Sequence, residues 1–312
     1  MKVGEVLLEV TRNDLVESVH AGHLLVIDPA GRDKLALGDL DSLIYPRSAV
    51  KGLQAAAMLR AGLRISPKEL ALVCASHAGS DEHLAVAASI LEGAGLEEGA
   101  LQNTPDKPLG IIERSAWGNR APSSIAANCS GKHAGMVATC VAAGWDVNTY
   151  KDPSHPLQLA IRAEFETLSG ESITKVAIDG CGAPLFALSL RALARAMHKL
   201  ANSEDPIHRE VVAACRAHPE MVSGPGRLPT VLMERVPNLF AKDGAEGVFI
   251  IALVGGGAIA WKMSDGSQRG ASALAAASLS QLGINIEFER EFVRGGGEVV
   301  GEIRASRLVR HG

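Results

Sequence analysis

The chain has 312 residues, of which 47% are hydrophobic and 21% charged, so it can bury a large core as an ordinary globular protein does. A formal net charge of −4, with no basic stripe or tail, argues against a nucleic-acid or anionic-membrane partner. The N-terminus lacks the apolar segment of a secretory signal, and no apolar run reaches the roughly 18 residues of a membrane span. Five scattered cysteines, an odd number, favour free thiols over a disulfide framework. We therefore expect a cytoplasmic protein.

Beta-forming segments separated by turn signals dominate the start of the chain. They occupy Val6–Thr11, Leu15–His20, His23–Asp28 and Leu35–Leu37. These segments predict an antiparallel meander. A helix is then predicted from Ser48 to about Gly62, and the apolar run Leu70–Ala75 is predicted to be a buried strand.

Helical periodicity governs the middle of the chain, and strand character returns at its end. Helices are predicted over Ser80–Gly93, Ser130–Ala143, Pro156–Leu168, Leu185–Ala201 and Asp205–Ala217. Strands are predicted over Lys175–Ile178, Val248–Val254, Ala258–Met263, Ile284–Phe288 and Val299–Arg304, with a hairpin turn at Gly255–Gly257. The pattern predicts an α/β (α+β) fold in one catalytic unit, residues 1–312. Its mainly antiparallel sheet comes from about 1–47 and 245–312, and its helical region from about 48–244.

Asn128–His133 brings a thiol, a hydroxyl, an ammonium and an imidazole together at the start of a predicted helix. Cys129, Lys132 and His133 have the spacing i, i+3 and i+4, so they share one helix face. Such a set of reactive side chains is more typical of a site than of a fold element.

A second polar cluster, Asp179–Pro184, places an acid and a thiol on a glycine-flanked turn. Cys129 and Cys181 could simply be small buried apolar residues, which is the usual role of a free cysteine. Their polar surroundings, with Lys132 and His133 nearby, instead favour a soft-metal site, and zinc is the leading candidate.

Ser48 and Lys51 form a Ser-x-x-Lys pattern, in which a neutral amine can activate the hydroxyl as a nucleophile. The pattern alone is weak, because a second copy at Ser172–Lys175 leads into a strand and is attributed to chance. Ser76 follows the predicted strand and is either functional or a helix cap. Lys262, considered alone, is most simply a solvated residue of an edge strand.

Several motifs occur together in one order along the chain. They are Arg47–Lys51, Cys74–His77, Asn128–Met136, Asp179–Cys181, His218–Gly224 and Lys262. In order and spacing, from near residue 3 to about residue 266, the chain resembles the Rhizobium etli-type L-asparaginases, the third asparaginase class. The resemblance implies a fold similar to serine β-lactamases and glutaminases, and a homodimer.

The resemblance also implies two Ser–Lys tandems. Ser48 matches the nucleophile of the family and Lys51 its activating partner, while Ser76 and Lys262 match the second tandem.

For the metal, the resemblance implies a zinc site formed by Cys129, Lys132 and Cys181. Asp179 and His133 lie beside this site and, with Arg47, are expected to bind the substrate. Since the Ser–Lys pairs already supply a nucleophile and a base, zinc is expected to support the site rather than attack the amide.

The function expected from these residues is hydrolysis of L-asparagine to L-aspartate and ammonia. The chain contains no Gly-Thr dipeptide, so the self-cleaving route of another asparaginase class is closed to it. Two alternatives remain open at this point. One is another Ser-x-x-Lys amide or ester hydrolase, and the other is a zinc-dependent binding or regulatory protein without turnover.

Overall fold

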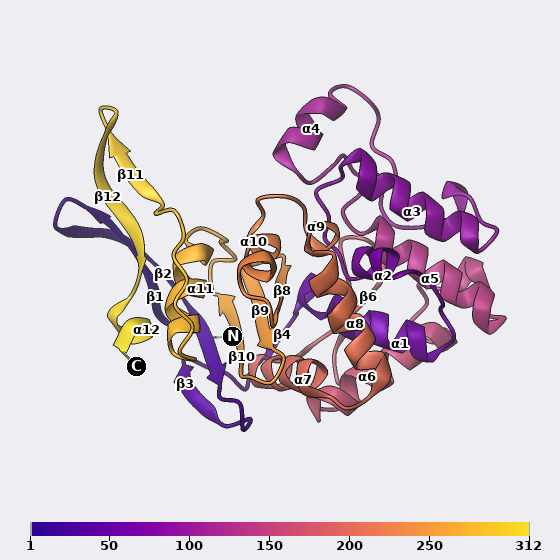
Figure 1. The fold of residues 1–312 in the computed structure, drawn as a ribbon, viewed down its shortest axis with the longest axis horizontal. Helices are drawn as coiled ribbons and strands as arrows, with labels where there is room; N and C mark the ends of the chain where they lie inside the picture. Colours follow the sequence, from indigo (N-terminus) through magenta and orange to yellow (C-terminus); the bar gives the residue numbers. More distant parts are fainter. Residues whose placement is uncertain (1, 312) are drawn as a thin grey trace.

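Both ends of the chain contribute strands to one antiparallel sheet in the computed structural model, which describes residues 2–311 (Figure 1). Within that range eight strands form this sheet, in the order β11-β12-β1-β2-β10-β9-β8, with β3 also paired to β2. Their bounds are β1 (Glu5–Arg12), β2 (Leu15–Ile27), β3 (Asp33–Leu37), β8 (Leu239–Gly244), β9 (Val248–Leu253), β10 (Ala258–Met263), β11 (Phe292–Gly295) and β12 (Glu298–Ala305). The expected antiparallel sheet built from both termini is confirmed.

The two termini are joined because β1 lies between β2 and β12. Leu8 of β1 pairs with Ala305 of β12, and both side chains are buried. The two strands predicted over Leu15–His20 and His23–Asp28 are one continuous strand, β2, whose second half lies in the core. Its first half is largely exposed and extends beyond the helices.

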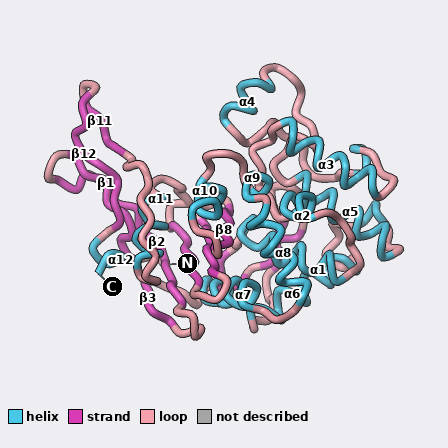
Figure 2. The backbone as a smooth tube through the Cα atoms, in the orientation of Figure 1, coloured by secondary structure: helices cyan, strands magenta, loops and turns pink. Residues whose placement is uncertain are grey.

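Helices and short strands fill the segment between the two parts of the sheet (Figure 2). The helices are α1 (Lys51–Arg60), α2 (Pro67–Val73), α3 (Asp81–Gly93), α4 (Ile111–Trp117), α5 (Ser130–Ala143), α6 (Pro156–Ser169), α7 (Leu190–Asn202), α8 (Pro206–Ala217), α9 (Pro219–Val222), α10 (Leu228–Arg235), α11 (Ala271–Ser280) and α12 (Arg307–His311). Short 3-10 turns occur at η1 (Arg47–Val50), η2 (Glu98–Ala100) and η3 (Val147–Thr149). Two small antiparallel pairs join β4 (Leu43–Ile44) to β7 (Leu188–Ser189) and β5 (Val176–Ile178) to β6 (Pro184–Phe186). None of the helices described is long and apolar enough to cross a membrane.

Helix α1 is the centre of the helical region. It contacts α2, α5, α6 and α8, and every residue from Lys51 to Leu59 is buried. The preceding turn, η1, packs against β8 and β9, so the start of α1 lies where the helices meet the sheet. Helix α7 packs on β2, β9 and β10 and closes the same core from the sheet side.

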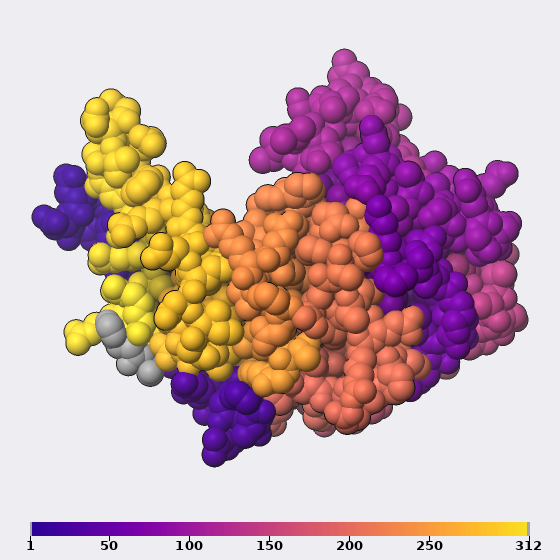
Figure 3. All heavy atoms as spheres, viewed as in Figure 1, coloured from indigo at the N-terminus to yellow at the C-terminus, as the bar shows by residue number. Residues whose placement is uncertain are grey.

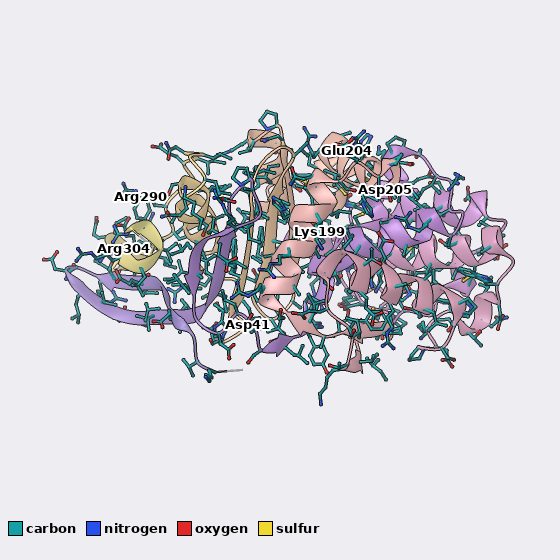
Figure 4. All side chains as sticks on the ribbon, turned by 90° about the horizontal axis from the view of Figure 1, so that it is seen from below. Asp41, Lys199, Glu204, Asp205, Arg290 and Arg304 are labelled. Atoms are coloured by element: carbon teal, nitrogen blue, oxygen red, sulfur yellow. The ribbon has the colours of Figure 1, made fainter. Side chains whose placement is uncertain are left out.

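The strands from the two termini project as an arm beyond this core. Figure 3 shows a broad hollow between the arm, which includes the yellow C-terminal strands, and the magenta segment around α4. Seen from below in Figure 4, Arg290 and Arg304 mark the end with the arm, and Lys199 of α7 lies near the middle of the molecule.

The predicted strand Leu70–Ala75 is wrong, because Leu70–Val73 belong to helix α2. A capping box begins this helix: the Ser66 side chain accepts from the Glu69 N–H, and the Glu69 carboxylate accepts from the Ser66 N–H. Pro67 at the first helical position adds to this signal. A short buried apolar run has no periodicity that separates helix from strand, so its flanks decide its structure.

Two other predicted elements need correction. The helix predicted over Leu185–Ala201 begins only at Leu190, because Ser189 pairs with β4 and its hydroxyl then caps α7. The predicted strand Ile284–Phe288 is an irregular segment, although its apolar side chains do pack on the core.

Gly131 allows α5 to approach α2 closely. A Cβ at Gly131 would lie 2.4 Å from the main-chain oxygen of Leu72, which cannot move without shifting α2.

We expect Gly131→Ala to destabilise the protein by about 1–3 kcal/mol in urea denaturation. Gly93→Ala is the matched control, because a Cβ there meets nothing within 4 Å. The control should be neutral or slightly stabilising, and equal unfolding midpoints for the two variants would contradict the packing argument.

Candidate active site

A cavity of about 240 Å³ lies where η1, the start of α5 and the turn after β5 meet. Its lining includes Ser48, Asp106, Asn128, Cys129, Asp179 and Cys181. Of the residues predicted from sequence, the cavity thus brings together Arg47, Ser48, both cysteines of the expected metal site and Asp179.

Arg47 turns the chain into this cavity. Its backbone has φ +52°, a left-handed conformation that costs a non-glycine residue on the order of 1 kcal/mol. The side chain is held by Asp179: the Arg47 Nε donates to the Asp179 Oδ1 at 2.7 Å. An arginine and an aspartate, both only partly exposed, therefore stand paired at the wall of the cavity beside Ser48.

Ser76 is the point at which two buried lysines meet. Its Oγ accepts from the Lys51 Nζ at 3.3 Å and from the Lys242 Nζ at 3.0 Å. The Lys51 ammonium also donates to the main-chain oxygen of Ala75. Burial lowers the pKa of Lys51 to about 8, and the positive charge of Lys132 acts in the same direction. Lys51 therefore loses its proton at a pH closer to neutral than an exposed lysine does.

Lys242 has a different electrostatic environment from Lys51. Its ammonium donates to the Asp243 Oδ1 at 2.5 Å, and the other oxygen of that carboxylate accepts from Arg227 at 3.0 Å. Burial lowers the pKa of Lys242, while the charge of Asp243 opposes that change. Within the described residues, no carboxylate forms an ion pair with Lys51.

No hydrogen bond joins Lys51 to Ser48 among the described residues. Ser48 lines the cavity, and its main-chain oxygen accepts the N–H of Lys51 at the start of α1. The nucleophile predicted from sequence therefore lies at the cavity, while its predicted base is bonded to Ser76.

Lys262 does not pair with Ser76, contrary to the expected second tandem. Its Nζ donates to the main-chain oxygens of Glu246 at 2.5 Å and Met263 at 2.7 Å. Besides Lys51, the lysine bonded to the Ser76 hydroxyl is Lys242 on β8, which was not among the residues predicted from the sequence. The sequence does contain a signal for it: Lys242–Gly244 has the Lys-x-Gly form of the motif that accompanies Ser-x-x-Lys in β-lactamases.

The two cysteines of the expected metal site lie together with His133. The ligand atoms of Cys129, His133 and Cys181 are all within 4.8 Å of one another. The Nδ1 of His133 is bonded to the Tyr150 hydroxyl at 2.6 Å, while its Nε2 is buried without a partner. Two sulfurs and an imidazole nitrogen are the donors that zinc prefers, and a hydrogen bond at the other ring nitrogen is typical of a metal-binding histidine. The residues fit a soft metal.

Lys132 completes this cluster by donating to the Cys181 Sγ at 3.1 Å. A hydrogen bond from Cys129, together with the charge of Lys132, lowers the pKa of Cys181 far below that of an ordinary thiol. Burial opposes the charge on Lys132, but the negative charge of Cys181 still raises its pKa above the usual value. Lys132 therefore stabilises a thiolate in the metal-free protein and would have to lose a proton to become a ligand.

Burial also lowers the pKa of His133, to about 4, and the positive charge of Lys132 adds to the effect. The imidazole is therefore neutral at physiological pH, as a metal ligand must be. His133 was expected beside the metal as a substrate-binding residue. In the structure its ligand atom lies within 4.8 Å of those of both cysteines, so it can itself be a metal ligand.

With this geometry established, comparison with known proteins identifies the family. The family described as L-asparaginase II matches residues 8–305. The chain belongs to the L-asparaginase II family. The resemblance seen in the sequence is thereby confirmed, and an amidohydrolase is the kind of enzyme that the family supports.

The solved structures that are similar to this asparaginase II family member have low sequence identity to it. "Crystal Structure Analysis of Mglu" matches with a TM-score of 0.44 and 13% identity, covering 84% of this chain and 67% of the other. "Crystal structure of Mglu in its native form in the presence of 4.3M NaCl" matches with a TM-score of 0.46 and 14% identity, covering 88% and 66%. The chain thus spans about two thirds of the length of these structures. No curated protein matches it.

Substitution of Lys242 and of Lys262, followed by an amidohydrolase assay, shows which of these two lysines hydrolysis depends on. We expect Lys242→Met to lower kcat for amide hydrolysis at least about 100-fold, because it removes a charged group bonded to Ser76. Lys262→Met should keep kcat within a few-fold, because its ammonium bonds main-chain oxygens instead. The reverse result would return Lys262 to the catalytic centre and leave Lys242 a structural residue.

Proposed function

We propose that this protein is an L-asparagine amidohydrolase, which forms L-aspartate and ammonia through an acyl-enzyme on Ser48. The observation that carries the proposal is the Ser76 hydroxyl shared by two buried lysines, next to the turn that holds Ser48. Hydrolysis of a carboxamide needs a nucleophile, a base that accepts its proton and a donor for the leaving nitrogen. In a member of the L-asparaginase II family, these residues can supply all three.

Lys51 is the general base in this proposal. With a pKa of about 8, roughly one Lys51 in ten is neutral at pH 7, which is far more than for an exposed lysine. As the Ser48 oxygen attacks the amide carbonyl, its proton passes to the Lys51 amine. Lys51 is bonded to Ser76 and not to Ser48 in the structure, so this transfer requires Lys51 or Ser48 to move toward the other.

Ser76 delivers the proton that the leaving nitrogen needs. Its hydroxyl gives that proton to the amide nitrogen as the C–N bond breaks, and takes a replacement from the ammonium of Lys51. Ammonia leaves, and a water molecule then attacks the acyl-enzyme by the same groups in reverse. Lys242 stays charged beside Ser76 and stabilises the negative charge that develops there.

Arg47 and Asp179 are proposed to bind the charged end of the substrate. A free amino acid carries one carboxylate and one ammonium group, and these two side chains offer the complementary charges at the cavity wall. The 2.7 Å pair between them keeps both groups in place before the substrate arrives.

A zinc ion is proposed to bind at Cys129, Cys181 and Lys132, with His133 as a further ligand. When bound, zinc would supply a fixed positive charge that organises this side of the cavity. The acid–base steps above use only the serines and lysines.

The remaining features expected from the family belong to the same proposal. A serine β-lactamase/glutaminase-like fold is supported by Ser48 at the start of a buried helix beside a strand that carries Lys242–Gly244. A homodimer is supported by the arm, where Leu15, Val19 and Phe292 are exposed. A cytoplasmic location is supported by the five free cysteines.

Asparagine turnover tests the function directly. The purified protein should release ammonia from L-asparagine, and Ser48→Ala should lose at least about three orders of magnitude in kcat. L-Glutamine should react more slowly, although one methylene alone is discriminated by only about 1–3 kcal/mol. Ser172→Ala, in the second Ser-x-x-Lys pattern, is the matched control and should keep full activity.

Each alternative function predicts a different result in this assay. Full activity in Ser48→Ala would exclude Ser48 as the nucleophile. Turnover of esters or other amides without asparagine would favour another Ser-x-x-Lys hydrolase. Saturable binding of asparagine without ammonia release would favour a binding protein.

Metal removal tests the zinc site. The protein should bind about one zinc per chain by elemental analysis, and chelation should raise KM more than it lowers kcat, because zinc supports substrate binding. Cys181→Ala should remain folded and lose the metal, whereas Cys140→Ala, a buried thiol further along α5, should keep it. Absence of metal after zinc loading would contradict the site. Complete loss of kcat on chelation, restored by zinc, would make the metal catalytic instead.

A further inference from the structure

The two lysines on Ser76 have unequal electrostatic partners. Lys51 donates to two oxygens that carry no charge, those of Ala75 and Ser76. Lys242 donates to the same Ser76 hydroxyl and also to the carboxylate of Asp243 at 2.5 Å. A buried ammonium without a counter-charge tends to lose its proton, whereas one against a carboxylate keeps it.

Asp243 is itself held in one orientation. Its Oδ1 faces Lys242, and its Oδ2 accepts from the Arg227 guanidinium at 3.0 Å. Arg227 in turn donates from its Nε to the Ser223 hydroxyl at 2.6 Å. The main-chain oxygen of Ser223 accepts from Ala78, two residues after Ser76. The carboxylate is therefore fixed between two cations and tied to the segment that carries the shared hydroxyl.

Resting on the proposed function, we propose that Asp243 is a positioning residue that assigns opposite roles to the two lysines. Asp243 keeps Lys242 protonated as the charged partner of Ser76. Lys51, which has no such carboxylate, is left as the group that releases and accepts the proton. Both lysines are bonded to the Ser76 hydroxyl. Because Lys242 keeps its proton and Lys51 does not, protons are exchanged with Lys51 and not with Lys242.

Titratable and charged groups act on Lys242 from several elements. Asp243 lies beside it on β8, Arg227 at the start of α10, Lys51 in α1, Cys74 at the end of α2 and Cys215 in α8. Burial and the charge of Arg227 lower the pKa of Lys242, while the carboxylate of Asp243 and, to a smaller extent, Cys74 raise it. Asp243 and Arg227 therefore act on Lys242 with opposite signs.

The role assignment predicts two limbs in the pH profile of kcat/KM. Activity should rise with pH as Lys51 loses its proton, near pH 8, and fall at higher pH as Lys242 loses its own. Asp243→Asn removes the negative charge and should move the alkaline limb to lower pH by about one unit or more. Arg227→Gln removes a positive charge and should move the same limb to higher pH. A purely structural defect would lower the whole profile without moving a limb.

Lysine NMR gives a measurement that does not depend on catalysis. In protein with ¹³C-labelled lysines, the Lys242 signal, identified by its loss in Lys242→Arg, should titrate at lower pH in Asp243→Asn and at higher pH in Arg227→Gln. Arg235→Gln, at the other end of α10, is the control and should move neither limb nor signal. If the wild type does not hydrolyse asparagine, the proposed function fails, but the titration still tests the positioning role.

An unchanged Lys242 titration in both variants would overturn the proposal, as would shifts of the same sign. If Asp243→Asn does not fold, Arg227→Gln alone decides, since only its upward shift agrees with the proposed role.

Discussion

The structure depends on how it buries two lysine ammonium groups at a single hydroxyl. Lys51 is 2% exposed and Lys242 is fully buried, and charged groups removed from water are costly unless they are bonded. The Ser76 hydroxyl accepts a hydrogen bond from each of the two ammonium groups, so its position must be fixed precisely. Its N–H donates to the Val222 oxygen, and the next N–H, of His77, donates to the Asn128 oxygen. The end of α2, the start of α5 and α9 therefore have to meet at this point.

Much of the fold could be predicted from the sequence, since the sheet and most helices have regular periodicity or clear caps. The prediction of α5 over Ser130–Ala143 is confirmed, and the hairpin at Gly255–Gly257 joins β9 to β10. One error arose in an element that is fully buried. The run Leu70–Ala75 is apolar on all sides, so only its capping box shows that it is helical.

The individual motifs of the candidate site could be predicted from the sequence. Which residues from distant parts of the chain come together there could not. Ser48 and Cys129 stand in dense motifs that single them out in the sequence. Lys242 is 166 residues from Ser76 and lies on β8, a strand that the sequence analysis did not predict. Lys262 lies two strands away on β10, opposite Val248 of β9, and its ammonium bonds main-chain oxygens instead of the hydroxyl.

The lysine cluster and the cysteine cluster are parts of one structural unit. The Nε2 of His77 is bonded to the Ser130 hydroxyl at 2.9 Å, which joins the Ser76 segment to the first turn of α5. That turn also carries Cys129 and Lys132, so a displacement of α5 moves both clusters together. Gly131 makes the arrangement possible, because any side chain there would press against the main chain of α2. The glycine between the reactive residues of Asn128–His133 is therefore required by packing, while its neighbours are available for chemistry.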